Sequence, residues 1–119
     1  MKMFIDADGK YSFSYKRTPA VISAYGEEFV LPVRNAEFLE KLAEADKKVS
    51  SAQNIHERAL ALREAVSVFI GKENTDKIFP DADTADLDEM QAFILSLAGT
   101  VKQKSIELIR EKYKCEDLF

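Results

Sequence analysis

Apolar and polar positions alternate along the first third of the chain. Aromatic residues alternate with serines over 11–15, and Phe29, Leu31 and Val33 again occupy every second position. A period of two is typical of half-buried strands, and Asp8-Gly9 and Tyr25-Gly26 are typical of turns between strands. We therefore expect residues 1–34 to be mostly extended and to form a small antiparallel sheet of two to four strands.

From Asn35 the spacing of apolar residues lengthens to three or four, the period of one helix face. Asn35 suits an N-cap, and Gly71 suits the residue that ends a helix. If unbroken, a helix from Asn35 to Ile70 would be about 54 Å long, and its apolar stripe would exceed what a small bundle covers. A break near Ser51 is the alternative, since it would fold the segment back on itself.

The last third contains a connector and a final helix. Residues 72–83 are predicted to connect the helices, with Phe79 packed on them. Asp83 or Thr84 is predicted to cap the final helix, which has an apolar stripe of its own and ends near Lys114.

These patterns predict an α+β fold that is mainly α. A small N-terminal antiparallel sheet should pack on a bundle of two to four long amphipathic helices. The 119 residues are enough for one ordinary domain, 1–119, in which residues 35–114 are helical and residues 115–119 form a tail.

Composition bears on the cellular compartment of the protein. The single cysteine cannot form an internal disulfide. The N-terminal residues lack the apolar core of a signal peptide, and no apolar run approaches the ~18 residues of a membrane helix. We expect a cytoplasmic protein without a membrane partner.

No catalytic, cofactor or metal site is expected. Asp6-Ala7-Asp8-Gly9 resembles part of a calcium loop, but Phe4 and Tyr15 would occupy liganding positions of that loop. His56 is the only histidine and Cys115 the only cysteine, so neither has the partner groups that a catalytic or metal centre requires. The sequence therefore predicts a protein that is not an enzyme.

The charge distribution bears on nucleic acid binding. The net charge is −4, which disfavours a protein that binds the phosphate backbone. Acidic residues gather over 81–89 and basic residues over 102–114. We expect no specific nucleic acid partner; the alternative is a small regulator that binds nucleic acid through the basic face of the C-terminal helix.

The amphipathic helices are the remaining candidates for a binding surface. Apolar area that one small bundle cannot cover usually marks an interface. We therefore predict a homo-oligomer, or a protein that binds an apolar helical partner. The candidate protein-binding residues are Leu42, Val49, Leu62, Val66, Leu97 and Val101.

The order of the segments also carries a family resemblance. An extended start ending in Phe29-Val30-Leu31-Pro32-Val33-Arg34-Asn35-Ala36-Glu37 leads into a charged helical segment. The segment 65–80 then has a phenylalanine near a helix end, a glycine and a Lys-Ile-Phe element. Over residues 28–104 this layout resembles the small tail assembly chaperones of long-tailed phages and prophages of Gram-positive bacteria. Residues 11–24 depart from the shorter starts of that family.

The resemblance implies a role without catalysis. Such chaperones coat the helical tape-measure protein until subunits of the tail tube replace them. It therefore implies that this chain binds the tape-measure protein or another phage tail protein. A structural or adaptor subunit of a phage particle is the alternative, because it would use the same helices for permanent assembly.

Overall fold

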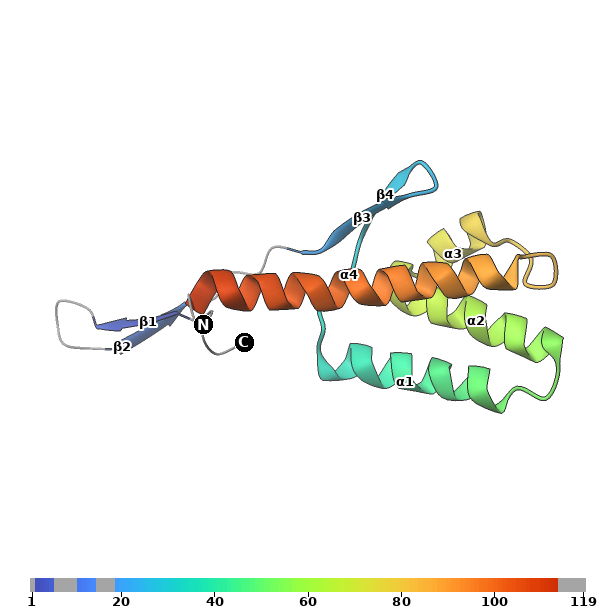
Figure 1. Ribbon diagram of the computed structural model, residues 1–119, viewed down its shortest axis with the longest axis horizontal. Coiled ribbons are helices and arrows are strands. Elements are labelled where there is room, and N and C mark those ends of the chain that lie inside the picture. Colours follow the sequence, from blue (N-terminus) through green and yellow to red (C-terminus); the bar gives the residue numbers. More distant parts are fainter. Residues whose placement is uncertain (1, 6–10, 15–18, 114–119) are drawn as a thin grey trace.

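The computed structural model describes residues 2–5, 11–14 and 19–113. The fold is mainly helical, as predicted: an antiparallel hairpin near the N-terminus precedes four helices that pack together (Figure 1). The elements are β1 (Lys2–Ile5), β2 (Tyr11–Ser14), β3 (Val21–Ala24), β4 (Glu27–Val30), α1 (Ala36–Ser51), α2 (Ile55–Ile70), α3 (Lys72–Ile78) and α4 (Leu87–Tyr113). The predicted turn at Asp8-Gly9 and the predicted tail lie outside the described residues.

The described strands form two separate antiparallel hairpins, β1–β2 and β3–β4, rather than one sheet. The two residues between β3 and β4 are Tyr25 and Gly26, with φ angles of 54° and 75°. Positive φ at both central positions is the geometry of a tight hairpin turn, as the sequence predicted. From this hairpin, the Phe29 side chain enters the core, and so does that of Leu31 just beyond β4.

Residues 35–70 do not form one unbroken helix: the structure has the alternative, a break near Ser51. The chain reverses at Ala52–Asn54, so α1 and α2 form a helical hairpin (Figure 1). Asn54 is extended and its side chain accepts a hydrogen bond from the Glu57 backbone N–H at 2.9 Å, which starts a new helix. The predicted caps are confirmed: Asn35 accepts from the Phe38 N–H at 2.9 Å, and Gly71 ends α2 with a φ of 83°.

The segment after α2 also differs from the prediction. Residues 72–83 contain a short helix, α3, whose buried Thr75 donates its hydroxyl to the Gly71 carbonyl at 2.8 Å. Phe79 follows and is buried, as predicted. Asp86, rather than Asp83 or Thr84, caps α4: its carboxylate accepts from the Asp88 and Glu89 backbone N–H groups at 2.9 and 3.2 Å.

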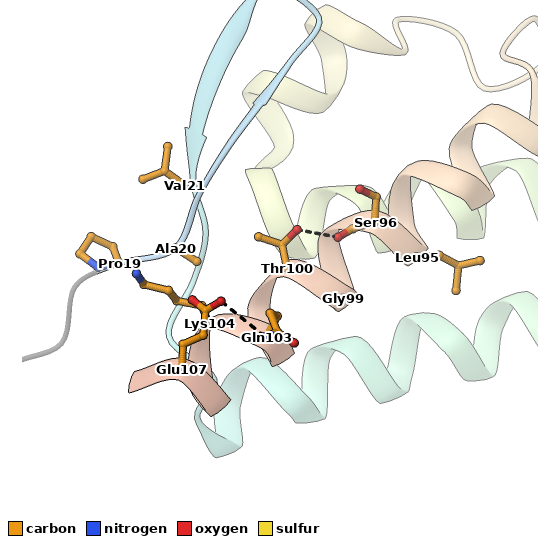
Figure 2. A pocket seen from close by; sticks show the side chains of 10 residues that line it. All are labelled: Pro19, Ala20, Val21, Leu95, Ser96, Gly99, Thr100, Gln103, Lys104 and Glu107. Atoms are coloured by element: carbon orange, nitrogen blue, oxygen red, sulfur yellow. Dashed lines mark hydrogen bonds between the residues drawn. The ribbon is translucent and has the colours of Figure 1, made fainter. Parts of the chain in front are cut away.

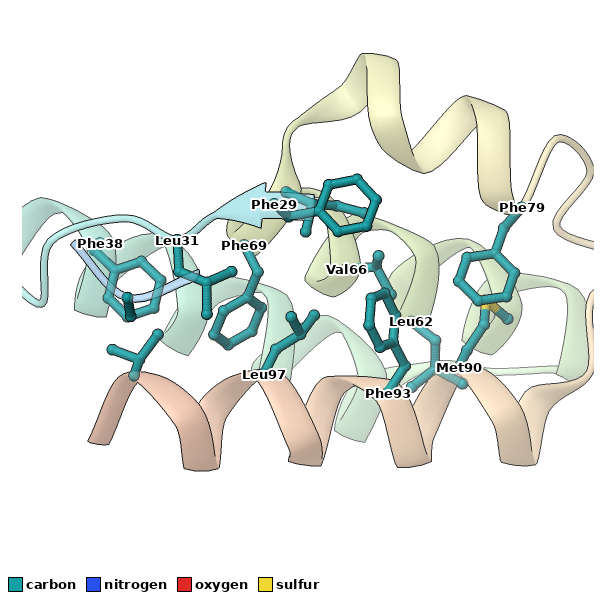
Figure 3. Close-up of a cluster of buried hydrophobic side chains, with 13 residues drawn as sticks. Phe29, Leu31, Phe38, Leu62, Val66, Phe69, Phe79, Met90, Phe93 and Leu97 are labelled. Carbon is teal, nitrogen blue, oxygen red and sulfur yellow. The ribbon is translucent and has the colours of Figure 1, made fainter. Parts of the chain in front are cut away.

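The core lies between α2, α4 and the β3–β4 hairpin (Figure 3). Helix α2 contacts α1, α3 and α4, so it is the central element of the helical part. Among the described residues the most completely buried side chains include Met90 and Leu97 of α4 and Val66 of α2. Phe38 of α1 packs edge-on against Phe69 of α2, with ring centroids 5.4 Å apart. Within the described part of the chain, no helix is long and apolar enough to cross a membrane.

Candidate binding groove

A groove runs between α1 and α4, and its floor is α2. It encloses about 420 Å³ and we call it the α1–α4 groove. Its lining is apolar apart from Asp46 and Gln91. The lining residues are Leu39, Leu42, Ala43, Asp46, Val49, Leu62, Ala65, Gln91, Ile94, Leu95 and Ala98.

The groove stays open because of how the helices pack and which side chains line it. Helices α1 and α4 both pack on α2, on either side of it (Figure 1). Ala43, Ala65 and Ala98 come from the three different helices, and their single methyl groups are too short to fill the space between them. The result is an apolar channel that the described part of the chain does not fill.

Exposed leucines stand on both walls of the groove. Leu39 of α1 is 41% exposed, and Leu95 of α4 is 67% exposed. Each leaves apolar area in water that a partner could cover at a gain of roughly 25 cal/mol per Å². An exposed ion pair links the α1 wall to α2: Lys48 Nζ donates to the two carboxylate oxygens of Glu64 at 2.9 and 3.1 Å.

The structure divides the six predicted binding residues into two groups. Leu42, Val49 and Leu62 come together in the lining of the α1–α4 groove, and Leu62, on the floor of the groove, is also part of the core with an exposure of 4%. Val66, Leu97 and Val101 lie in the core instead, with exposures of 0%, 0% and 2%. Their apolar character is accounted for by packing within the chain, so a partner cannot reach them while the helices stay together. Figure 3 shows Leu62, Val66 and Leu97 in this core.

Sequence reasoning did not select the two most accessible leucines of the groove. Leu39 follows Phe38, which lies in the main stripe of α1, and is rotated about 100° from it around the helix. Leu95 is likewise offset from the buried stripe of α4. An apolar residue beside the main stripe can indicate a binding surface. The same position is also apolar when a helix buries a broad face, so the sequence alone does not separate the two cases.

A second hollow lies on the other side of α4 (Figure 2). Pro19, Ala20 and Val21 face α4 there, across about 590 Å³ of open space. Its α4 wall is more polar: the Thr100 hydroxyl donates to the Ser96 carbonyl at 2.8 Å, and Gln103 donates to Glu107 at 3.4 Å. Leu95 belongs to the walls of both hollows.

The titratable groups have structural partners. His56 Nδ1 lies 2.5 Å from the Asp83 carboxylate, whose hydrogen bond and charge raise the pKa of His56. Burial, and then Glu89, raise the pKa of Tyr25, whose hydroxyl donates to Glu89 at 3.2 Å. Arg63 pairs with Asp76 and so joins α2 to α3.

No set of side chains in the described ranges forms a metal site. No three His, Cys, Asp or Glu residues gather there in a way that could hold an ion. The candidate calcium loop at Asp6-Ala7-Asp8-Gly9 and the thiol of Cys115 lie outside the described residues.

Comparison with known proteins adds no relative. No family model matches the chain, and neither a curated protein nor a solved structure is similar to it. The α1–α4 groove is therefore the structural feature that best indicates a function.

Proposed function

We propose that this protein is a non-enzymatic binding protein whose α1–α4 groove receives the apolar face of a helix from another protein. The observation that carries the proposal is an open apolar groove with an exposed leucine on each wall. Laying an amphipathic helix into an apolar groove is a recurrent mode of protein recognition. The bound helix would complete a layer that α1 and α4 leave open above α2.

The lining defines the chemistry of the partner. Leucine, isoleucine and valine side chains favour a helix with apolar anchors three or four residues apart. Asp46 adds a negative charge to the α1 wall, so a lysine or arginine of the partner beside those anchors would be favoured. The tape-measure protein of a long-tailed phage is a long helical protein, and the resemblance in the segment order makes it the partner we propose. The proposed role is that of a tail assembly chaperone.

The proposal is tested by binding to a helical fragment of a tape-measure protein encoded beside this chain. The fragment should bind the wild type, and Ala43→Glu should weaken binding by at least about tenfold because it places a charge in the groove. Ala43 is exposed, so the substitution should leave the fold intact. Leu60→Glu is the matched control: Leu60 is 47% exposed on α2 but lies outside the groove.

Two results would overturn the proposal. One is a wild-type protein that ignores the fragment, and the other is an Ala43→Glu variant that binds as tightly as the wild type. Calorimetric titration measures both affinities, and circular dichroism checks that each variant is folded.

A structural or adaptor subunit would use the same groove, so exchange kinetics separate the two roles. A chaperone has to release its helix when tail-tube subunits replace it, whereas a structural subunit keeps its helix. Adding tail-tube protein to the labelled complex should therefore release the fragment. A complex that persists would favour the structural role.

A further inference from the structure

The outer face of α4 carries a second surface that is distinct from the core stripe. Asp88, Ala92, Leu95, Gly99 and Lys102 are spaced by four, three, four and three residues, and all five are exposed. This spacing places them in one line along the helix. The line faces away from α2, since the residues that α4 buries lie on its opposite side.

Packing among the described residues does not account for two members of this line, Leu95 and Gly99. Leu95 is 67% exposed, the second-highest value among the large apolar side chains that are exposed. Gly99 lies inside a helix, where glycine costs about 1 kcal/mol relative to alanine. A Cβ added at Gly99 would meet no atom within 4 Å, so no contact within the described chain requires a glycine. A glycine on an exposed helix face permits close approach of another backbone.

The charges along the line indicate that the partner helix is α4 of a second copy of the chain. Asp88 lies seven residues before Leu95, and Lys102 lies seven residues after it. A two-fold axis through Leu95 would run two copies of α4 antiparallel, with Asp88 opposite the partner's Lys102 at both ends. The surface is therefore complementary to itself, as a two-fold interface requires.

We propose that two copies of the chain associate through antiparallel pairing of α4, with Leu95 on the two-fold axis. The leucine pair is buried at the centre, the small residues Ala92 and Gly99 allow close approach, and an ion pair closes each end. Leu95 also belongs to the wall of the α1–α4 groove, so pairing of α4 would compete with a tape-measure helix for this side chain. The inference itself rests on the α4 face and does not depend on which helix the groove binds.

Charge reversal tests the pairing directly. Asp88→Lys and Lys102→Asp should each weaken the dimer on the order of tenfold, because each replaces two ion pairs by two like-charge contacts. The double variant restores opposite charges at both ends and should recover most of the affinity. Analytical ultracentrifugation over a concentration series measures all four proteins. A wild type that stays monomeric up to about 1 mM, or a double variant no better than the single ones, overturns the proposal.

Cross-linking tests the position of the axis. In a Cys115→Ser background, Leu95→Cys should form a disulfide-linked dimer under mild oxidation, because the two thiols would face each other across the axis. Leu60→Cys, also at an exposed leucine, should stay monomeric. Association that persists without a Leu95→Cys cross-link would place the contact elsewhere and overturn the proposal.

A pair of variants separates this inference from the proposed function. Ala92→Arg adds bulk and charge to the outer face of α4 but lies outside the α1–α4 groove, so it should abolish self-association and leave the tape-measure fragment bound at least as tightly as by the wild type. Ala43→Glu should do the opposite. A dimer that survives Ala92→Arg contradicts the α4 pairing, and the fragment titration fails or succeeds independently of that result.

Discussion

Replacing Asn54 by alanine tests the chain reversal on which the α1–α4 groove depends. The Asn54 side chain accepts from the Glu57 backbone N–H at 2.9 Å. The Glu57 carboxylate in turn accepts from the Gln53 backbone N–H at 2.7 Å. Alanine removes the first of these acceptors, and the first turn of α2 then has an unpaired backbone donor.

The expected loss in free energy of unfolding depends on the lost N-cap and on how exposed Asn54 is. Loss of such an N-cap costs about 1 kcal/mol, and in a chain of this size that lowers the melting temperature by about 4 °C. Asn54 is exposed, so water solvates the freed N–H and keeps the cost near this value rather than above it. In a helix that ran unbroken through this position, alanine would instead stabilise the protein by about 0.5 kcal/mol, because asparagine is a weaker helix former. The two architectures therefore predict opposite signs.

Urea unfolding followed by circular dichroism measures the effect, at protein concentrations low enough to keep the chain monomeric. Asn54→Asp is the control, since it keeps an acceptor at the cap and should stay within a few tenths of a kcal/mol of the wild type. An Asn54→Ala variant that is more stable than the wild type would refute the helical hairpin, and with it the groove.

Three further predictions concern the core, the glycines and the histidine. Leu97→Ala should lower the free energy of unfolding by about 3–5 kcal/mol, because the side chain is 0% exposed; a loss below about 1 kcal/mol in urea unfolding would contradict its place in the core. Gly71→Ala should destabilise by about 1 kcal/mol or more, because its φ is 83°. Gly99→Ala should stabilise the monomer by about 1 kcal/mol. If both alanine substitutions changed the free energy of unfolding in the same direction, the backbone conformation described for Gly71 or for Gly99 would be wrong. Asp83 raises the pKa of His56 above 6.5, so the pair stabilises the fold fully below that pH and loses its effect as pH rises through the folded-state pKa. His56→Gln should therefore flatten the pH dependence of unfolding above about pH 6.5, and an unchanged profile would show that the pair contributes nothing.

The features that the sequence predicted well are those set by local chemistry. The Asn35 cap, the Gly71 helix end and the Tyr25-Gly26 turn each depend on a side chain or a φ angle within a few residues. The helical hairpin could not be decided in the same way. Apolar residues keep their helical spacing on both sides of the break at Ala52–Asn54, because both helices present that face to the same core.

The binding residues show where periodicity stops being informative. Leu42 and Val66 both belong to the stripe predicted over residues 35–70, yet one lines an open groove and the other is fully buried. Spacing identifies the face of a helix that avoids water, but the burial of each position depends on which helices lie opposite. That depends in turn on the reversal before Ile55, which the spacing does not reveal.

Helix α4 shows how a partner surface can be recognised once the internal contacts are known. Its apolar positions exceed what one neighbouring helix can cover: α2 and the hairpin bury Met90, Leu97 and Val101, whereas Ile94 is only partly buried at the groove. Leu95 remains in water, beside a groove on one side and a hollow on the other. An isolated exposed leucine needs no explanation. Leu95, however, lines a groove and also lies midway between an acid and a base on one helix face, so it belongs to both proposed interfaces. Substitutions at Ala43 and Ala92, each of which belongs to one interface alone, are therefore the ones that test the two separately.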